Sequence, residues 1–401
     1  MMTEEEKQSK ERKKRKRGKR AHGTGSIFRR PERKGKQWVA QIVLEHGKTR
    51  QRYFNTQEEA ADALNEMLYE LKRGMLVTSP KQTIKQYLEH WLENVHKPTI
   101  RISTYVRYRA ILNRYLLPKI GHIQLQMLAP QHIQTLYTEK VHDGLSPMTI
   151  NMIHGVLHKA LDNAVQTNLL VRNICDVVRP PRIAKYEIQP LTTEQAQKLL
   201  ETAQGHFIAP LLTLALTTGM RRGELLGLRW QDIDFEKKSL QVRRSVDRIA
   251  GYGFVESEPK TTRGRRKVTL PHFVIDILKQ HRAHQLEVRL KAGAAWRDRG
   301  LVFCNAQGGF LDPHRLLHLF KQLLKDAGLP KMRFHDLRHS AASILLSAGV
   351  PAKVVQELLG HSQIGMTLGT YSHVLPGMQE AAMDKWDDLF GDNEDGKEER
   401  N

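Results

Sequence analysis

The stretch FHDLRHSAASILL, residues Phe334–Leu346, places two histidines and an arginine in the first turns of an expected helix. His335 and His339 are four residues apart, the spacing at which HExxH zinc enzymes hold their metal. The residue after His335 is Asp336, however, where that mechanism requires a glutamate base. His335 and Arg338 also share a helix face, and a histidine beside a permanent cation suits a phosphate group. The stretch by itself therefore leaves two alternatives open, a metal site and a phosphate site.

The composition points to an intracellular protein with a polyanionic partner. The chain has 401 residues and a formal net charge of +21, which favours nucleic acid or an anionic membrane surface. The apolar stretch Phe207–Leu216 is far shorter than the ~20 residues that a membrane-spanning helix needs, and it predicts a buried core helix. Cys175 and Cys304 are the only cysteines, so a disulfide framework is excluded. No apolar segment follows the basic N-terminus, and we expect a reducing compartment.

The N-terminal part predicts a disordered basic tail followed by a small DNA-binding domain. Residues 1–20 include ten lysines and arginines between positions 7 and 20. Residues 21–76 contain three alternating stretches and a helix that begins with a capping box of Thr56 and Glu59, which predicts a three-stranded sheet with one helix against it. In the middle strand, Trp38, Ala40 and Ile42 alternate onto one face together with Leu44. We expect the free face to carry DNA-contacting residues from the set Arg29, Arg30, Gln41, Arg50 and Arg52.

Residues 81–178 predict a helical domain. Its first helix has an apolar series at helical spacing that consists of Ile84, Tyr87, Leu88, Trp91, Leu92 and Val95. The next helix interleaves tyrosines with the basic residues Arg101, Arg107, Arg109 and Arg114. These arginines form either a solvated face or a set of phosphate contacts. Pro147 then opens a further helix. The proline-rich residues 179–190 predict a linker, residues 191–390 a second domain of helices and a small sheet, and residues 391–401 an acidic tail.

Five places in the second half concentrate side chains that can act on a phosphodiester. They are TTGMRRGELLGLRWQDID, the basic hairpin EPKTTRGRRKVTL with Lys260, His335 with Arg338, LLGHS with His361, and TLGTYSHV with Tyr371. Each feature has an ordinary structural explanation when it is taken alone, such as a surface ion pair, a solvated turn, a helix cap or a packed aromatic ring. Neither a phosphate-binding loop of the GxxxxGK[ST] type nor an acidic metal cluster is present in the sequence.

The order and spacing of these motifs resemble the tyrosine recombinase, or phage integrase, family. The similarity rests on TGMRRGELLGLRW, HDLRHS, LGHS and the tyrosine of TYSH, and it extends over about residues 81–385. The N-terminal sheet resembles the arm-site binding domain in integrases of phages and conjugative transposons. The resemblance implies a multidomain, mainly α chain with small sheets (α+β). An arm-type domain at residues 21–76 would precede a helical, SAM-like core-binding domain at 81–178 and a mixed α/β catalytic domain at 191–390.

The resemblance also implies a role for each site residue. Tyr371 would attack a DNA phosphorus and form a 3'-phosphotyrosyl bond. Arg221 and Arg338 would hold the non-bridging oxygens, where negative charge gathers in the transition state. His335 and His361 would donate hydrogen bonds and carry protons, and Lys260 would protonate the leaving 5'-oxygen. Glu224 and His339 would have supporting roles. The residues alone leave alternatives, namely Arg222 for Arg221 and Arg263, Arg265 or Lys267 for Lys260.

The implied function is a site-specific recombinase that integrates or excises a mobile element. It would need no cofactor, because a phosphotyrosyl bond conserves the energy of the broken phosphodiester without ATP or metal. The expected partners are double-stranded DNA at arm and core sites, three further copies in a homotetramer on two duplexes, and an accessory excision or DNA-bending protein in the bacterial cytoplasm. Three alternatives stay open: a DNA-binding regulator with an inactive recombinase fold, a type IB topoisomerase-like enzyme, and a zinc hydrolase at His335 and His339.

Overall fold

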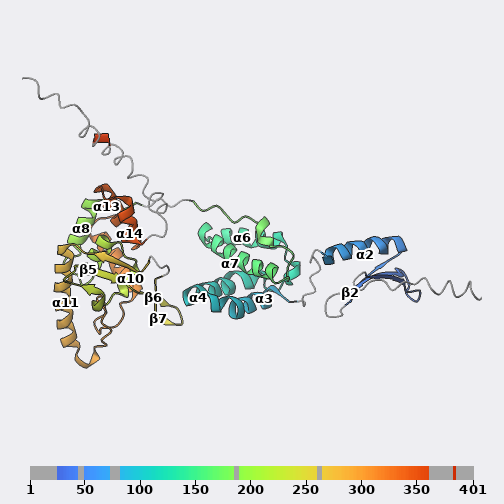
Figure 1. Cartoon of the computed structure of the whole chain (residues 1–401), viewed down its shortest axis with the longest axis horizontal. Helices are drawn as coiled ribbons and strands as arrows, with labels where there is room; N and C mark the ends of the chain where they lie inside the picture. Colours follow the sequence, from blue (N-terminus) through green and yellow to red (C-terminus); the bar gives the residue numbers. More distant parts are fainter. Residues whose placement is uncertain are drawn as a thin grey trace, which may run out of the picture. The chain divides into compact units, whose positions relative to one another are not determined.

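The structure, a computed structural model, describes residues 25–43, 49–72, 82–184, 189–259, 264–360 and 383–384 (Figure 1). The chain divides into two compact units, of which the first ends at Ala184. The architecture is mainly helical with small antiparallel sheets, as predicted. Among these described residues, no helix combines the length and the apolar character needed to cross a membrane.

The first described segment is a three-stranded antiparallel sheet covered by one helix. The strands are β1 (Ser26–Arg29), β2 (Trp38–Val43) and β3 (Thr49–Phe54), in the order β1-β2-β3, and the helix is α2 (Gln57–Lys72). The capping box is present, because Glu59 N donates to Thr56 Oγ1 at 3.2 Å and Thr56 N donates to Glu59 Oε2 at 3.4 Å. Ala40 and Ile42 are fully buried and pack with the apolar side of α2, as the alternation in β2 predicts. Leu44 lies outside the described residues.

The strand register narrows the set of residues predicted for the free face of this sheet. Paired residues of antiparallel strands point to the same side, and Arg52 pairs with Ala40 while Arg50 pairs with Ile42. Both arginines therefore share the face that α2 covers, and Arg52 Nη1 lies 3.3 Å from Glu66 Oε2 of that helix. Arg29, which pairs with Trp38, is also on this side. The sequence could not show this, because alternation defines two faces without saying how neighbouring strands are aligned.

The free face instead carries Gln41, Gln51, Tyr53 and the side chain of Arg30. Gln51 Nε2 donates to Gln41 Oε1 at 2.6 Å, and the Tyr53 hydroxyl donates to Gln51 Oε1 at 3.0 Å. Arg30 Nη1 lies 3.5 Å from the same hydroxyl oxygen, and the Arg33 guanidinium lies 4.0 Å from the centre of the Tyr53 ring. Of the five expected DNA-contacting residues, Gln41 and Arg30 are thus on the exposed sheet face.

The following segment of the first unit is helical. It contains α3 (Ile84–His90), η2 (Trp91–His96), η3 (Lys97–Thr99), α4 (Ile102–Ile111), η4 (Leu112–Leu116), α5 (Leu117–Ile120), η5 (Leu125–Met127), α6 (Pro130–His142), α7 (Pro147–Gln166) and η6 (Ile174–Val177). Ser146 caps α7 by accepting a hydrogen bond from Thr149 N, so Pro147 opens this helix as predicted. A single apolar core joins these helices.

The prediction that Val95 continues the inward apolar series is wrong, and His96 takes the inward position. Val95 is 41% exposed, whereas His96 is 8% exposed and stacks on Trp91 with ring centroids 4.7 Å apart. The reason is that residues 91–96 form a π-helix, whose wider turn shifts the inward direction by one residue. In the next helix Tyr105 is buried, and Arg101, Arg107, Arg109 and Arg114 are exposed, which suits both roles considered for these arginines.

The second unit combines seven α-helices with two small sheets among its described residues. The helices are α8 (Thr193–Thr202), α9 (Ala209–Thr218), α10 (Arg222–Leu226), α11 (His272–Ala292), α12 (Pro313–Asp326), α13 (Asp336–Ser347) and α14 (Ala352–Leu359). The strands are β4 (Ile233–Asp234), β5 (Ser239–Val242), β6 (Ser245–Ile249), β7 (Gly253–Ser257) and β8 (Arg266–Thr269), with short helical turns η7 (Trp230–Asp232) and η9 (Gly293–Ala295). One sheet has the order β4-β5-β8, and the other pairs β6 with β7. The prediction of a hairpin around Lys260 is therefore wrong, because β7 and β8, the strands on either side of it, pair with different partners.

Helix α9 is the central element of this unit. It is apolar all round, with Leu211, Leu212 and Leu214 fully buried, as expected for the Phe207–Leu216 stretch. Phe207 itself precedes the helix and is 41% exposed. Helices α8, α10, α11 and α13 all contact α9. The two stretches that contain Arg221 and Arg338 are therefore attached to the same rigid core.

Candidate active site

Arg221 lies in a sharp turn between two helices. Helix α9 ends at Gly219, whose φ of 60° is left-handed, and a Cβ atom there would come within 2.3 Å of Leu359 Cδ2. Glycine is favoured here, because it adopts this conformation without strain and leaves room for the Leu359 side chain. Helix α10 then begins at Arg222 with Arg221 as its N-cap residue. The side chain of Arg221 is 44% exposed, so its cationic end remains accessible at the surface of the buried core.

Glu224 is the buried anion that holds this turn together. Its side chain is 3% exposed and accepts three hydrogen bonds. Arg221 donates through Nη1 to Oε1 at 2.9 Å and through its backbone N to Oε2 at 3.0 Å, and Arg266 donates through Nη2 to Oε2 at 3.0 Å. Burial alone would raise the pKa of Glu224, but the charges of Arg266 and Arg221 outweigh it and hold the pKa below its ordinary value. Glu224 is therefore an ionised acceptor shared by two arginines.

Arg338, on α13, connects the same turn to the end of helix α14. Its side chain is buried, with 3% of the residue exposed. Nη1 donates to the carbonyl oxygen of Gly219 at 2.7 Å, and Nη2 donates to the carbonyl oxygen of Leu359 at 2.6 Å. These two bonds define the plane of the guanidinium group. The orientation of Arg338 is consequently set by the folded protein itself.

His335 and His339 lie beside these arginines on the first turns of α13. Their ring centroids are 5.3 Å apart and the rings are nearly perpendicular. Desolvation and the neighbouring charges of Arg338 and Arg221 lower the pKa of His335. Desolvation and the charge of His335 lower the pKa of His339 to about 4. Both imidazoles are thus favoured in the neutral form. Among the described residues, these two histidines do not belong to any group of three potential metal ligands.

The depressed pKa of His339 predicts that acid destabilises the second unit. The unfolded imidazole titrates near 6.5 and the folded one near 4, so between these values the unfolded state binds the proton more strongly. At pH 5 this preference lowers the free energy of unfolding by about 2 kcal/mol, and by less to the extent that water reaches the ring. The Tm of wild type should therefore fall between pH 7 and pH 5, and the Tm of His339→Gln should fall less. Thermal unfolding followed by circular dichroism measures both. His284→Gln, at an exposed position on α11, is the matched control, and equal losses in His339→Gln and wild type would contradict the assignment.

The sequence left Arg222 as an alternative to Arg221, and Arg263, Arg265 or Lys267 as alternatives to Lys260. The described alternatives make contacts outside the network around Glu224. Arg222 points toward β6, where its Nη2 lies 3.9 Å from Asp247 Oδ1. Arg265 is paired with Glu258 at 2.5 Å, and Lys267 is exposed on β8. Lys260, Arg263, His361 and Tyr371 lie outside the described residues.

Arg266 is a site residue that the sequence patterns did not single out. It occupies the first position of β8, and its side chain is 6% exposed. A signal was present in the sequence, because alternation in RRKVTL places Arg266 on the same face as Val268 and Leu270, which are both buried. A charged residue at an inward strand position requires a buried partner, and that partner is Glu224.

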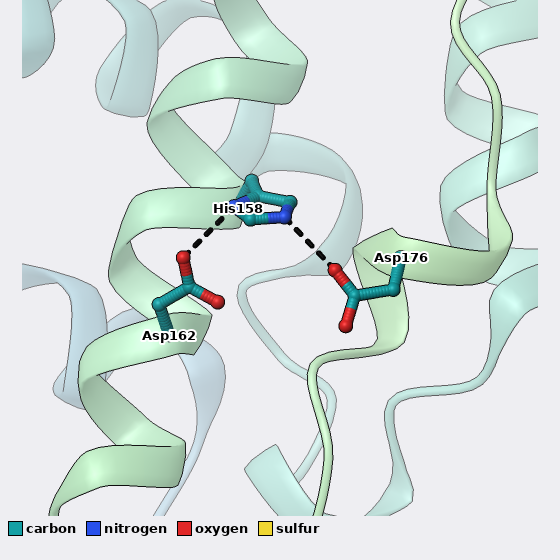
Figure 2. Close-up of side chains that lie close together, drawn as sticks. All are labelled: His158, Asp162 and Asp176. Carbon is teal, nitrogen blue, oxygen red and sulfur yellow. Dashed lines mark hydrogen bonds and ion pairs between the residues drawn. The ribbon is translucent and has the colours of Figure 1, made fainter.

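A separate polar cluster lies in the helical segment of the first unit. His158 Nδ1 is 3.0 Å from Asp162 Oδ2, and Nε2 is 2.9 Å from Asp176 Oδ1 (Figure 2). The two carboxylates approach opposite ring nitrogens, whereas a metal ion binds only one nitrogen of an imidazole. His158 lies on α7 and Asp176 on η6, so the contact between them connects the two elements. Asn173 Nδ2 strengthens the cluster by donating to Asp162 Oδ1 at 2.6 Å. The geometry therefore describes a polar cluster that connects η6 to α7.

Comparisons with known proteins identify the class. The model of the phage integrase family matches residues 189–377, and the model of the phage integrase N-terminal SAM-like domain matches residues 83–141. A tyrosine recombinase XerC-like protein of Caldanaerobacter subterraneus subsp. tengcongensis is 33% identical over 356 residues, which cover 84% of this chain and 91% of that protein. The chain belongs to the phage integrase family. It is a tyrosine site-specific recombinase.

Solved structures share the fold. The Tn1549 transposon integrase in complex with transposon right end DNA aligns with a TM-score of 0.64 and 23% identity, over 76% of this chain and 99% of that one. A lambda integrase tetramer bound to a Holliday junction aligns with a TM-score of 0.54 and 16% identity, over 84% of this chain and 95% of that one. At these identities the likeness extends to the arrangement of helices and strands.

Proposed function

We propose that this recombinase integrates or excises a mobile element by transesterification through Tyr371, with a 3'-phosphotyrosyl DNA intermediate. The observation that carries the proposal is the buried network around Glu224 and Arg338. It brings together the TGMRRGE turn, strand β8, helix α13 with HDLRH, and the end of α14. Four segments that are far apart in the sequence thus converge on one place in the second unit. Lys260 precedes β8 in the sequence, and His361 follows α14.

The chemistry assigned to the described residues follows from their surroundings. Arg221 and Arg338 would contact the non-bridging oxygens of the scissile phosphate, and both guanidinium groups are held in advance by protein acceptors. Such preorganised donors stabilise a transition state without reorientation during the reaction. His335, whose pKa is lowered by its surroundings, would accept the proton of the attacking hydroxyl. His339 would pack against His335 and keep its ring oriented.

The remaining roles belong to residues that the structure does not describe. Lys260 would protonate the leaving 5'-oxygen, since an alkoxide is a poor leaving group without an acid. His361 would donate to a phosphate oxygen. The phosphotyrosyl bond conserves the energy of the broken phosphodiester, so rejoining would require neither ATP nor a metal ion.

The partners proposed for this chain are DNA duplexes and further copies of itself. The helical and catalytic segments would bind the core site, with the exposed Arg101, Arg107, Arg109 and Arg114 contacting phosphates. Residues 21–76 would bind outlying arm sites through the free sheet face that carries Gln41 and Arg30. The lambda integrase of similar fold was solved as a tetramer bound to a Holliday junction, and we propose a homotetramer on two duplexes here. An accessory excision or DNA-bending protein and a bacterial, DNA-associated location belong to the same proposal.

The test is to trap the covalent intermediate. The full chain is incubated, with EDTA present, with a duplex that carries the end of its own mobile element and a nick beside the cleavage position. Release of the short fragment prevents rejoining, so an SDS-stable protein–DNA adduct should accumulate, and peptide mapping should place the DNA on Tyr371. An adduct mapped to another residue, or cleavage only when metal is supplied, would overturn the mechanism. DNA binding without any adduct would favour an inactive regulator. In a separate assay with a supercoiled plasmid that carries the site and a second duplex, relaxation of the plasmid without strand exchange would favour a topoisomerase.

A further inference from the structure

Arg266 makes three hydrogen bonds from a buried position at the start of β8. Its Nε donates to the carbonyl oxygen of Leu358 at 2.7 Å, and its Nη2 donates to Glu224 Oε2 at 3.0 Å. Its Nη1 lies 3.4 Å from the carbonyl oxygen of Gly264. The fork of N–H groups in a guanidinium can serve several acceptors at once, which a lysine ammonium at the same place cannot do with the same geometry. Arg266 therefore joins three segments of the chain.

Each of these three segments leads directly to a residue of the proposed site. Glu224 also holds the backbone and the guanidinium of Arg221. Leu358 precedes Gly360, which has a φ of 68°, and His361 follows immediately. Gly264 is the first described residue after the segment that contains Lys260. A displacement of Arg266 would therefore act on Arg221 and on the end of α14 together.

The end of helix α14 shows how closely Arg266 and Arg338 cooperate. The last carbonyl groups of a helix have no partner within it and carry partial negative charge. Here Gly360 N donates to the carbonyl oxygens of Gln356 and Glu357. The next two carbonyls, of Leu358 and Leu359, accept from Arg266 and Arg338 respectively. Both arginines also reach the turn of Arg221, one through Glu224 and the other through the Gly219 carbonyl.

We propose that Arg266 is a positioning residue for the recombination reaction, holding Arg221 and the α14 end that precedes His361 in a fixed relation. It acts through Glu224 and the Leu358 carbonyl and does not contact DNA. A buried ion pair is poorly explained by stability alone, because well-packed apolar residues of similar volume are often equally stable. The inference rests on the proposed function, since it assigns Arg266 to the site that contains Tyr371.

The test compares Arg266→Met and Arg266→Lys with wild type in single-turnover cleavage of the nicked duplex. The methionine variant keeps much of the volume and loses all three hydrogen bonds, so the cleavage rate should fall about 100-fold, as for a small misplacement of catalytic groups. The lysine variant keeps the charge beside Glu224, so it should cleave about tenfold faster than the methionine variant. The affinity for the duplex, measured by fluorescence anisotropy, should remain close to that of wild type in both variants.

A pH profile adds a readout that a purely structural role would not change. In wild type the pKa of Glu224 is held below its ordinary value, so the carboxylate stays ionised above pH 5. Without Arg266, burial raises the pKa and the carboxylate becomes protonated as the pH falls. The rate of Arg266→Met should therefore decline on the acid side of neutrality more steeply than that of wild type. The double variant Arg266→Met with Glu224→Gln should cleave no more slowly than the slower of the two single variants, because both substitutions break the same Arg266–Glu224 pair.

Two controls separate a positioning role from a general change in strand β8 and from a loss of stability. Thr269 lies on the exposed face of the same strand, so the variant Thr269→Val should cleave at the wild-type rate. Leu324→Ala removes a buried core side chain of α12 and matches the loss of stability without touching the network. The inference is overturned if Arg266→Met cleaves at the wild-type rate. It is also overturned if Leu324→Ala, with the same Tm as Arg266→Met, cleaves equally slowly and shows the same pH profile. Should wild type itself form no adduct at Tyr371, the proposed function fails before Arg266 is tested.

Discussion

A Tyr371→Phe variant is expected to form no covalent adduct and to cleave DNA at least about 10⁴-fold more slowly than wild type, because it lacks the nucleophilic oxygen. Phenylalanine keeps the aromatic ring, so folding and the affinity for DNA should be preserved. The adduct is measured on denaturing gels with the nicked duplex. The affinity is measured with the same duplex by fluorescence anisotropy.

The matched control for this experiment is Tyr252→Phe. Tyr252 is 46% exposed in the turn between β6 and β7, and its substitution removes a hydroxyl group from the same unit without touching the network around Glu224. The adduct yield of this variant should equal that of wild type. If an adduct persists in Tyr371→Phe, the assignment of the nucleophile is wrong. Loss of DNA binding in Tyr371→Phe would mean that the tyrosine acts in recognition.

The second large effect is expected for Arg338→Lys, which should lower the single-turnover cleavage rate by about 10³-fold, comparable to the loss of one preorganised transition-state donor. The arginine is buried and bonded to two carbonyl oxygens, which lie on separate segments of the chain. A lysine ammonium can hydrogen-bond at one of these positions and cannot present a planar pair of donors to a phosphate. The charge remains, so any effect reports the geometry of the guanidinium group.

Arg333→Lys serves as the control on the same stretch of chain. The side chain of Arg333 is 58% exposed and pairs with Asp336 at 2.7 Å. A lysine there keeps the positive charge beside the buried Asp336 carboxylate, which the backbone N of residue 333 also contacts, so the variant should cleave much closer to the wild-type rate than Arg338→Lys. The interpretation of Arg338 is contradicted if Arg338→Lys keeps the wild-type rate, or if the rate falls only in proportion to a loss of DNA affinity.

The local features of the site were accessible from the sequence. The apolar stretch Phe207–Leu216 predicts a buried core helix, which α9 confirms, and Pro147 predicts the start of a helix, which α7 confirms. The spacing of His335 and Arg338 likewise predicts one shared face. These predictions succeed because each depends on backbone geometry within one turn or one strand. The capping box of Thr56 and Glu59 is a further example.

The errors lie where a neighbouring segment decides. Arg50 and Arg52 alternate correctly along β3, but only the pairing with β2 determines that their side faces α2. Val95 fits a regular helix, and the π-helix at residues 91–96 turns His96 inward in its place. For Arg266 the alternation indicates an inward position, but its partner Glu224 lies 42 residues away in the sequence, so the local pattern does not identify the acceptor.

The sequence by itself determined which chemical groups this recombinase possesses, in which order they occur, and which of them share a helix turn or a strand face. The tertiary structure alone decided which groups share an acceptor: Arg221 and Arg266 meet at Glu224, and Arg338 reaches a carbonyl 119 residues away. The physical reason is that helical and strand periodicities are set by local backbone geometry. Contacts between distant segments instead depend on how the apolar faces of α9, α13 and α14 pack, and no local spacing encodes that arrangement.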